Sequence, residues 1–181
     1  AAVSAAVSPN GNLVYYVQSK VKKKDQDRLL KIVNEARRIV RAESIYRGKP
    51  LRFAVNDDGS INMSSPPEFM DVSGIGPEDV IFDDVVTAQI ETSIMTPIKR
   101  MVACKAAGIP PRRSVLLEGP YGCGKSLTAR LAARVAELNG WTFVLLDKVQ
   151  GLKAALEFAN RYAPAVVFAE DIDRIAQERN E

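Results

Sequence analysis

The sequence predicts an α/β protein with a central parallel sheet, preceded by a small α+β module. Three observations carry this prediction: apolar strands that alternate with amphipathic helices, a glycine-rich turn that joins a strand to a helix, and a change of charge along the chain. Residues 1–76 hold 12 Lys and Arg against 8 Asp and Glu, whereas residues 77–181 hold 13 against 14. A Pro-, Gly- and Ser-rich stretch, Ser64 to Pro77, lies between them, so we expect a domain boundary near residue 76.

Composition excludes several classes of chemistry. The chain has no histidine, which excludes Ser/His/Asp and Cys/His catalysis and any metal site with a histidine ligand from this chain. Cys104 and Cys123 lie far apart without CxxC spacing, and the longest apolar run, Ala163 to Ala169, is too short to span a membrane. We therefore expect a cytoplasmic protein without a membrane segment. Because the chain opens with Ala1, we also expect a fragment of something longer.

The N-terminal module is predicted from one strand and one long helix. Leu13 to Val17 is a β-prone run, and Asp25 is a candidate N-cap for a helix that ends near Glu43. The apolar residues of this helix recur at three- and four-residue spacing, so we expect the face that they form to pack on another element. These residues are Leu29, Ile32, Val33, Ala36, Ile39 and Val40.

A hairpin and a basic cluster complete this module. Leu51 to Val55 and Ser60 to Met63 are predicted as paired strands around the turn Asn56 to Gly59. Lys20 and the run Lys22 to Lys24 form a basic cluster in front of the helix. Two interpretations stay open for the cluster: a solvated lead-in to the helix, which we favour, and a contact with nucleic-acid phosphates.

The motif that indicates function lies in the second part of the chain. A predicted strand, Ser114 to Glu118, is followed at once by Gly119-Pro120-Tyr121-Gly122-Cys123-Gly124-Lys125-Ser126, which fits the phosphate-loop pattern G-x-x-x-x-G-K-[ST]. An amphipathic helix follows and stops at Asn139-Gly140. Amides of such a loop and the helix N-terminus bind phosphate, Lys125 reaches the β- and γ-phosphates, and Ser126 ligates Mg²⁺.

The same loop admits other interpretations. A plain strand-to-helix turn would need neither Lys125 nor Ser126, so it is disfavoured. Cys123 is either a small spacer, which we favour, or a thiol activated by the helix start. Tyr121 is interpreted as a surface spacer and not as a stacking partner for adenine.

A second pair of elements ends in acidic residues. Trp141 to Leu146 is predicted as a strand, a helix runs from about Leu152 to Tyr162, and the apolar strand Ala165 to Ala169 leads into Glu170 and Asp171. Parallel strands place these acids and the phosphate loop at the same carboxyl edge of the sheet. One carboxylate near the metal and one that polarises the attacking water are what phosphoryl transfer needs. An acidic helix N-cap is the plainer alternative.

These segments, in their serial order, resemble the classical AAA subgroup of the AAA+ P-loop ATPases over about residues 77–181. The resemblance rests on Ile81 to Val86, a following helix with Pro97, Gly108 to Leu117, the phosphate loop, and Ala163 to Asp173. It implies a P-loop NTPase core that binds ATP or ADP with Mg²⁺, and assembly of the full-length protein into a ring, usually a homohexamer. It assigns adenine contact to Asp84, Val85 and Val86, and the phosphate cradle to Gly119, Pro120, Tyr121, Gly122, Cys123, Gly124, Lys125, Ser126 and Leu127. Glu170, with Ser126, would serve the metal directly or through water, and Lys125, Glu170 and Asp171 would carry catalysis.

Three departures from the family pattern bear on activity. The acids stand in the order Glu170, Asp171, where family members usually have Asp and then Glu, so either slow hydrolysis or a bridging water is expected. The connection between Leu146 and Leu152 is short and lacks the aromatic residue of the family's pore loop. The sensor asparagine, the arginine finger and the helical lid would lie beyond Glu181, so we expect a truncated nucleotide-binding domain.

The leading prediction is an ATPase that couples ATP turnover to remodelling of a protein partner. The alternatives are a nucleic-acid-handling ATPase of the loader type, suggested by the lysine cluster, and a nucleotide-dependent scaffold with weak hydrolysis, suggested by the exchanged acids.

Overall fold

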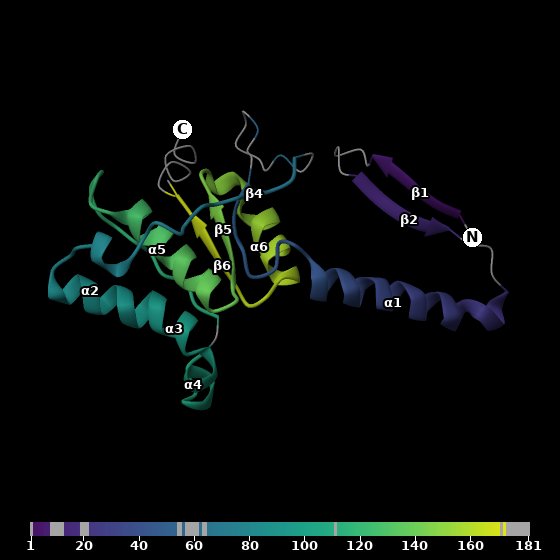
Figure 1. The fold of residues 1–181 in the computed structure, drawn as a ribbon, viewed down its shortest axis with the longest axis horizontal. Helices are drawn as coiled ribbons and strands as arrows, with labels where there is room; N and C mark the ends of the chain where they lie inside the picture. The colour runs from purple at the N-terminus through teal and green to yellow at the C-terminus, as the bar shows by residue number, and fades with distance from the viewer. Residues whose placement is uncertain are drawn as a thin grey trace, which may run out of the picture.

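The computed structural model describes residues 2–7, 13–18, 22–53, 56, 62, 65–110, 112–170 and 172. Within these ranges the chain forms two sheets and a set of helices, of which α1 projects away from the rest (Figure 1). The strands are β1 (Ala2–Val7), β2 (Leu13–Gln18), β3 (Pro50–Arg52), β4 (Glu68–Phe69), β5 (Thr142–Leu146) and β6 (Ala165–Ala169). The α-helices are α1 (Gln26–Glu43), α2 (Asp84–Ile90), α3 (Thr96–Lys99), α4 (Met101–Ala106), α5 (Lys125–Leu138) and α6 (Leu152–Arg161).

The larger sheet has the strand order β4-β3-β5-β6 and is mostly parallel. β5 pairs in parallel with both β3 and β6, so that Val144 lies opposite Leu51 on one side and Val167 on the other. β4 closes one edge in the antiparallel direction. The predicted mixed α/β class with a central parallel sheet is thereby confirmed.

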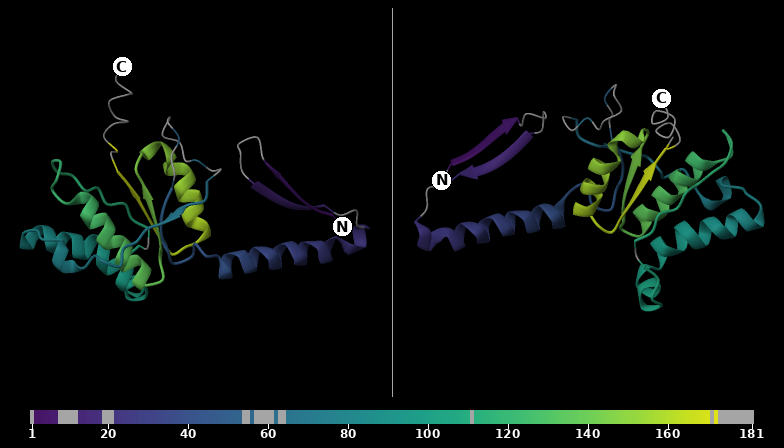
Figure 2. Two further views of the ribbon diagram at one scale, coloured as in Figure 1. Left: turned by 45° about the horizontal axis from the view of Figure 1, so that its top comes forward. Right: turned by 180° about the vertical axis from the view of Figure 1, so that it is seen from behind.

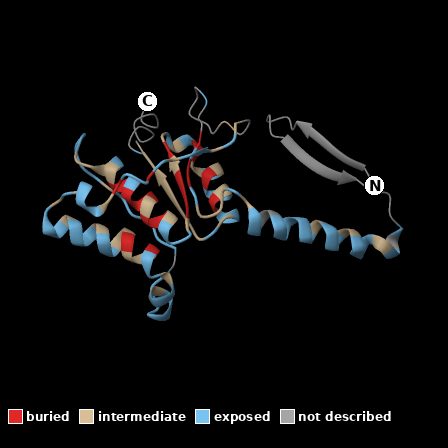
Figure 3. Cartoon of the chain, in the orientation of Figure 1, coloured by how far each residue is buried: buried red, intermediate tan, exposed pale blue. Residues whose placement is uncertain are grey.

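Helices cover both faces of this sheet because the side chains of β5 alternate between its two sides. Phe143 is fully buried in the cluster formed with α5, whereas Val144 and Leu146 are fully buried in the cluster formed with α6. Figure 2 shows the two helices on opposite sides of the strands, and Figure 3 shows that burial is concentrated in these three layers. The three-layer core therefore holds the carboxyl ends of β3, β5 and β6 at one edge.

The strand predicted at Ser114 to Glu118 is wrong. Residues 112–120 have no strand pairing, and Val115 and Leu116 are 44% and 73% exposed. A strand requires a partner for its backbone hydrogen bonds, and no described strand pairs with this segment. Both sides of β5 are already used by β3 and β6.

The N-terminal elements follow the prediction only in part. β2 and α1 confirm the predicted strand and helix, although Asp25 at the N-cap position makes no side-chain capping bond. β3 forms where a strand was predicted, but its antiparallel partner is β4 and not Ser60 to Met63, which lies outside the described residues except for Asn62. The turn predicted at Asn56 to Gly59 also lies outside them, apart from Asn56.

The apolar face of α1 does not pack as expected. Ile32 and Ile39 are 62% and 40% exposed, and only Leu29 and Val33 are half-buried among the described apolar positions of the helix. β3 and β4 join the sheet of β5 and β6 instead, so the boundary predicted near residue 76 does not separate two sheets.

Hydrogen bonds tie the chain before β3 to the core. The buried hydroxyl of Thr142 accepts from the Gly48 N–H at 3.0 Å and donates to the Tyr162 carbonyl at 3.1 Å. Lys49 forms an ion pair with Glu137 of α5 at 3.2 Å. Strand pairing, a buried hydroxyl and an ion pair thus hold this segment to the sheet and to both covering helices.

The helical segment after Phe82 contains one π turn, Glu91–Met95, between α2 and α3. Pro97 has no N–H to donate to the preceding turn, and its ring crowds the carbonyl four residues earlier, which favours such a distortion. Met95 and Ile98 are buried against the α5 cluster. In the described ranges, no helix has the length and apolar character that crossing a bilayer demands.

Candidate functional site

The glycine-rich loop before α5 has backbone geometry that only glycine adopts easily. Gly122 and Gly124 have φ of 80° and 93°, in the left-handed region. A Cβ on Gly124 would lie 3.0 Å from the Phe82 ring, and one on Gly119 would lie 2.7 Å from Cys123 Sγ. The loop is therefore folded tightly on itself and against Phe82, which the predicted tight phosphate loop requires.

The start of α5 presents backbone N–H groups without partners. Gly124 occupies the N-cap position and has no side chain to cap the helix. Among the described residues, nothing accepts a hydrogen bond from the N–H of Gly122, Gly124, Lys125 or Ser126. Free amides and the positive end of the helix dipole make such a terminus a binding site for anions.

Lys125 brings a positive charge to the middle of the loop. Its Nζ donates to the carbonyl oxygens of Gly119 at 2.6 Å and Pro120 at 2.9 Å, and lies 3.7 Å from Cys123 Sγ. The ammonium group is thus held inside the loop, next to the amides at the start of α5. The ammonium group and the amides without partners are thus parts of the same loop, which is the combination that phosphate binding needs.

Ser126 and Glu170 line one cavity of about 390 Å³ at the carboxyl edge of the sheet. Glu170 follows β6 directly, and its backbone N–H donates to the Leu146 carbonyl at 2.9 Å, which keeps the ends of β5 and β6 side by side. The other residues that line the cavity are Arg52, Glu68, Phe69, Met70, Asp71, Arg130, Leu145 and Asp147. The structure thus brings together two of the predicted site residues, while Asp171 lies outside the described residues.

The donor set of this cavity suits Mg²⁺. A serine hydroxyl and a carboxylate are hard oxygen ligands, and Mg²⁺ is usually bound by one or two such groups together with water and substrate phosphates. In the described part of the chain, no three acidic or cysteine side chains cluster as a metal site of their own. A metal held here would therefore depend on Ser126, Glu170 and the phosphate groups of a bound nucleotide.

Several residues of the cavity were missed by the sequence reasoning. Arg52 is the last residue of β3 and Asp147 directly follows β5, at the same edge as Glu170, and the two form an ion pair at 2.8 Å. Asp147 carries the signal that identified Glu170, an acid directly after an apolar strand, and could have been found in the same way. Arg52 could not, because its strand was predicted as part of a separate hairpin.

Asp71 is a further acid of the cavity with a specific environment. Its carboxylate accepts from the Ser73 hydroxyl at 2.7 Å and from the Ser73 N–H at 2.9 Å. These hydrogen bonds, with the charges of Arg130 and Arg134 as smaller contributions, lower the pKa of Asp71 below its ordinary value. The lowered pKa favours the ionised form of Asp71, which lines the cavity together with Glu68.

The residues predicted to meet adenine begin α2. Asp83 caps this helix by accepting from the Val86 N–H at 2.8 Å, so this amide already has a partner. Asp84 and Val85 are exposed, and the neighbouring Phe82 ring lies against Gly124. The structure thus places the Phe82 ring, which lies just before these residues, beside the phosphate loop.

The remaining loop residues divide by exposure. Tyr121 is fully exposed at the tip of the loop, as expected for a surface spacer. Cys123 is half-buried and faces Lys125. Pro120 is exposed and Leu127 is half-buried beside the α5 cluster.

Comparison with known families supports the predicted resemblance to AAA ATPases for part of the chain. Residues 115–181 match the sequence model of AAA, the ATPase family associated with various cellular activities. The matched segment contains the glycine-rich loop, α5, β5, α6, β6 and Glu170. No solved structure matches the chain.

Proposed function

We propose that this chain, whose residues 115–181 resemble the AAA family, binds ATP with Mg²⁺, hydrolyses it, and couples turnover to remodelling of a protein partner. The observation that carries the proposal is the shared cavity of Ser126 and Glu170, next to a glycine-rich loop that holds the Lys125 ammonium group. An anion-binding loop and oxygen ligands for a metal at one sheet edge are the two parts that phosphoryl transfer requires.

Each residue has a defined role in this proposal. Amides of the loop and Lys125 bind the β- and γ-phosphates, and Lys125 exchanges the carbonyls of Gly119 and Pro120 for phosphate oxygens. Ser126 and Glu170 hold Mg²⁺, directly or through water. Magnesium, when bound, neutralises phosphate charge. Asp171 accepts a hydrogen bond from the attacking water and orients it toward the γ-phosphate.

The order Glu170, Asp171 affects the expected rate. The acid on the metal side is one methylene longer, and the acid on the water side one shorter, than in the usual family order. Misplacement of a catalytic group by about 1 Å costs roughly a hundredfold in rate. We therefore expect slow hydrolysis, unless a water bridges the added distance from Asp171.

The partner and the assembly are inferred from the family resemblance. Family members form rings, usually hexamers, so we propose a homohexamer of the full-length protein with a protein client. Cys104 and Cys123 are free thiols, which supports a cytoplasmic location. A nucleic-acid-handling ATPase is the second candidate, favoured by the exposed basic helix α1.

The deciding experiment separates binding from turnover. Binding of ATP with Mg²⁺ is measured by calorimetry, and turnover by release of phosphate. We expect Asp171→Asn to bind ATP as the wild type does and to lose turnover, while Glu157→Gln, at an exposed residue of α6, keeps both. Unchanged turnover in Asp171→Asn rejects the role of Asp171, and a wild-type chain without affinity for ATP rejects the whole proposal. Turnover that rises with added protein, without DNA, supports remodelling.

A further inference from the structure

The net positive charge of the chain is concentrated on α1 and its flanks. Residues 22–47 hold 9 Lys and Arg against 4 Asp and Glu, a net charge of +5, and since the whole chain has +3, the remainder has −2. A charge asymmetry of this kind points to a polyanionic partner.

This basic segment is exposed and projects from the core. Figures 1 and 2 show α1 extending away from the three-layer core, and Figure 3 shows pale blue along most of its length. The side chains of Arg28 and Arg38 are 85% and 66% exposed. A partner as long as the helix, about 27 Å at 1.5 Å per residue, can therefore reach the charges without displacing the core.

The helix is attached firmly at one end. After α1, Arg47 donates from Nη1 to the Ala163 carbonyl at 3.2 Å. The Tyr46 ring stacks on Phe69 of β4 at 5.8 Å between centroids and contacts Phe158 of α6 at 5.9 Å. A hydrogen bond and two ring contacts thus hold the carboxyl-terminal flank of α1 to the core.

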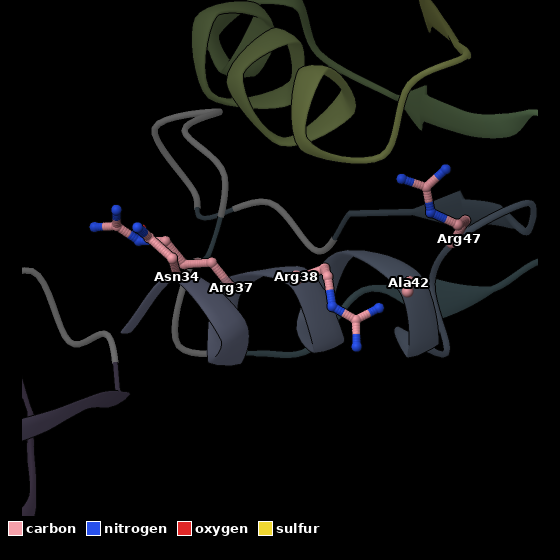
Figure 4. A pocket seen from close by; sticks show the side chains of 5 residues that line it. All are labelled: Asn34, Arg37, Arg38, Ala42 and Arg47. Carbon is pink, nitrogen blue, oxygen red and sulfur yellow. The ribbon is translucent and has the colours of Figure 1, made fainter. Parts of the chain in front are cut away.

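An open groove of about 470 Å³ lies at the attached end of the helix. The described residues that line it are Asn34, Arg37, Arg38, Ala42 and Arg47, and none of these carries a carboxylate. Arg38 donates to Glu35 through Nε at 2.9 Å and Nη2 at 2.6 Å, whereas Arg37 has no ion pair among the described residues. In Figure 4 the guanidinium groups of Arg37, Arg38 and Arg47 point in different directions, which suits a row of separate anionic groups better than one compact ion.

Basic side chains extend from this groove along one side of α1. Arg28, Lys31 and Arg38 of α1 are spaced by three and seven residues, so they lie on one side with rises of about 4.5 and 10.5 Å between them. Glu35, the ion-pair partner of Arg38, lies on the same side. Phosphates of a nucleic-acid strand repeat about every 3.4 Å along the axis, so each cation can meet a different phosphate. The helix has no aromatic residue that could stack on bases.

We propose that α1 and its flanks bind the phosphodiester backbone of nucleic acid without sequence preference. A membrane surface would instead take up the apolar side with Ile32 and Ile39, and would leave the arginine groove on the other side of the helix. The groove lies on the charged side of the helix, where the phosphates of a nucleic-acid strand can contact it. The surface is separate from the phosphate loop and acts whether or not ATP is hydrolysed.

The test compares two variants of equal charge. Lys24→Gln/Lys31→Gln/Arg37→Gln removes three exposed cations of this surface, and Lys105→Gln/Lys148→Gln/Lys153→Gln removes three exposed cations of the core. Both lower the net charge from +3 to 0. Binding to a fluorescein-labelled mixed-sequence duplex of 30 base pairs, and to a 30-nucleotide single strand, is measured by anisotropy between 50 and 200 mM salt.

We expect the wild type and the core variant to bind with steep salt dependence. For the α1 variant, the slope of the logarithm of the binding constant against the logarithm of the salt concentration should be smaller in magnitude by about two to three. Each phosphate that the variant no longer neutralises accounts for roughly 0.7 to 0.9 of this slope. Lys125→Ala should bind DNA as the wild type does, so failure of the ATPase proposal leaves this result unaffected. Circular dichroism checks that α1 stays helical. Equal loss in both triple variants, no salt-dependent binding, or binding only to phosphatidylserine vesicles would overturn the proposal.

Discussion

Lys125 Nζ lies 2.6 Å from the carbonyl oxygen of Gly119, across the glycine-rich loop that separates them. The lysine is therefore oriented by its own loop before it meets a ligand. In the proposed function, phosphate oxygens replace the carbonyl oxygens of Gly119 and Pro120 as acceptors for this ammonium group. If the loop binds phosphate as proposed, a lysine that is already held in place would reduce the conformational cost of binding.

The first prediction concerns this lysine. Lys125→Ala removes hydrogen bonds between an ammonium group and phosphate, each worth about 1.5 to 3 kcal/mol, so affinity for ATP should fall by roughly 10- to 100-fold or more. Titration with a fluorescent ATP analogue measures the change. Lys105→Ala, an exposed lysine on α4, should leave affinity unchanged. Equal affinity in Lys125→Ala and the wild type would show that the loop does not bind triphosphate through this residue.

The second prediction uses two glycines of the same loop. Gly122→Ala and Gly124→Ala both place a side chain at positive φ, at a cost of about 1 to 2 kcal/mol, but only Gly124→Ala also meets the Phe82 ring at 3.0 Å. Gly124→Ala should therefore be the less stable variant in urea unfolding. In a chain that already carries Phe82→Ala, the free energy of unfolding that Gly124→Ala removes should be close to the amount that Gly122→Ala removes from the wild type. Equal stability of the two single variants would contradict the contact.

The third prediction tests the attachment of the N-terminal segment to the sheet. Thr142→Val keeps the shape of the side chain but leaves the Gly48 N–H and the Tyr162 carbonyl without their partner. Each buried polar group left unpaired costs about 1 to 3 kcal/mol, so the midpoint of urea unfolding should fall clearly. Thr142→Ser keeps the hydroxyl and should retain most of the stability. Equal losses in the two variants would assign the effect to the methyl group instead.

The fourth prediction is a pH dependence at Asp71. Its pKa is lowered mainly by hydrogen bonds from Ser73, so the ionised form is favoured in the folded state. This contribution to stability is present above the pKa of the unfolded chain and is lost as the pH falls through the lower folded pKa. Ser73→Ala should raise the pKa of Asp71 in an NMR titration and lower stability at neutral pH only. Asp71→Asn should remove this titration, and an unshifted pKa in Ser73→Ala would contradict the assignment.

Local patterns in the sequence were sufficient for elements whose partners are close along the chain. The periodicity of α5, α6 and β6 predicted their type and approximate bounds, and the loop before α5 was predicted residue by residue. The parallel pairing of β5 and β6 could be predicted from the helix between them, since two strands of one sheet joined by a helix are usually parallel and connected by a right-handed crossover. Glu170 could therefore be placed at the correct edge of the sheet from local patterns alone.

Long-range pairing could not be predicted in this way. Ser114 to Glu118 has the composition of a buried strand, yet it lacks a ladder partner among the described strands, while the three-residue β3 is paired on both sides. Strand propensity depends on burial and neighbours, so a short run carries little information about which edge it joins. The contributions of Arg52 and Asp71 to the cavity depend on that pairing and were not visible in the sequence.

The sequence by itself determined which chemical groups the loop carries, because the glycines, Lys125 and Ser126 lie within one turn of chain and one helix start. Only the tertiary structure decided that Glu170 and Ser126 share a cavity, that β3 and β4 extend the same sheet, and that α1 projects as an exposed basic helix. These features depend on backbone hydrogen bonds and packing between residues far apart in the chain, whose free energy no local pattern records.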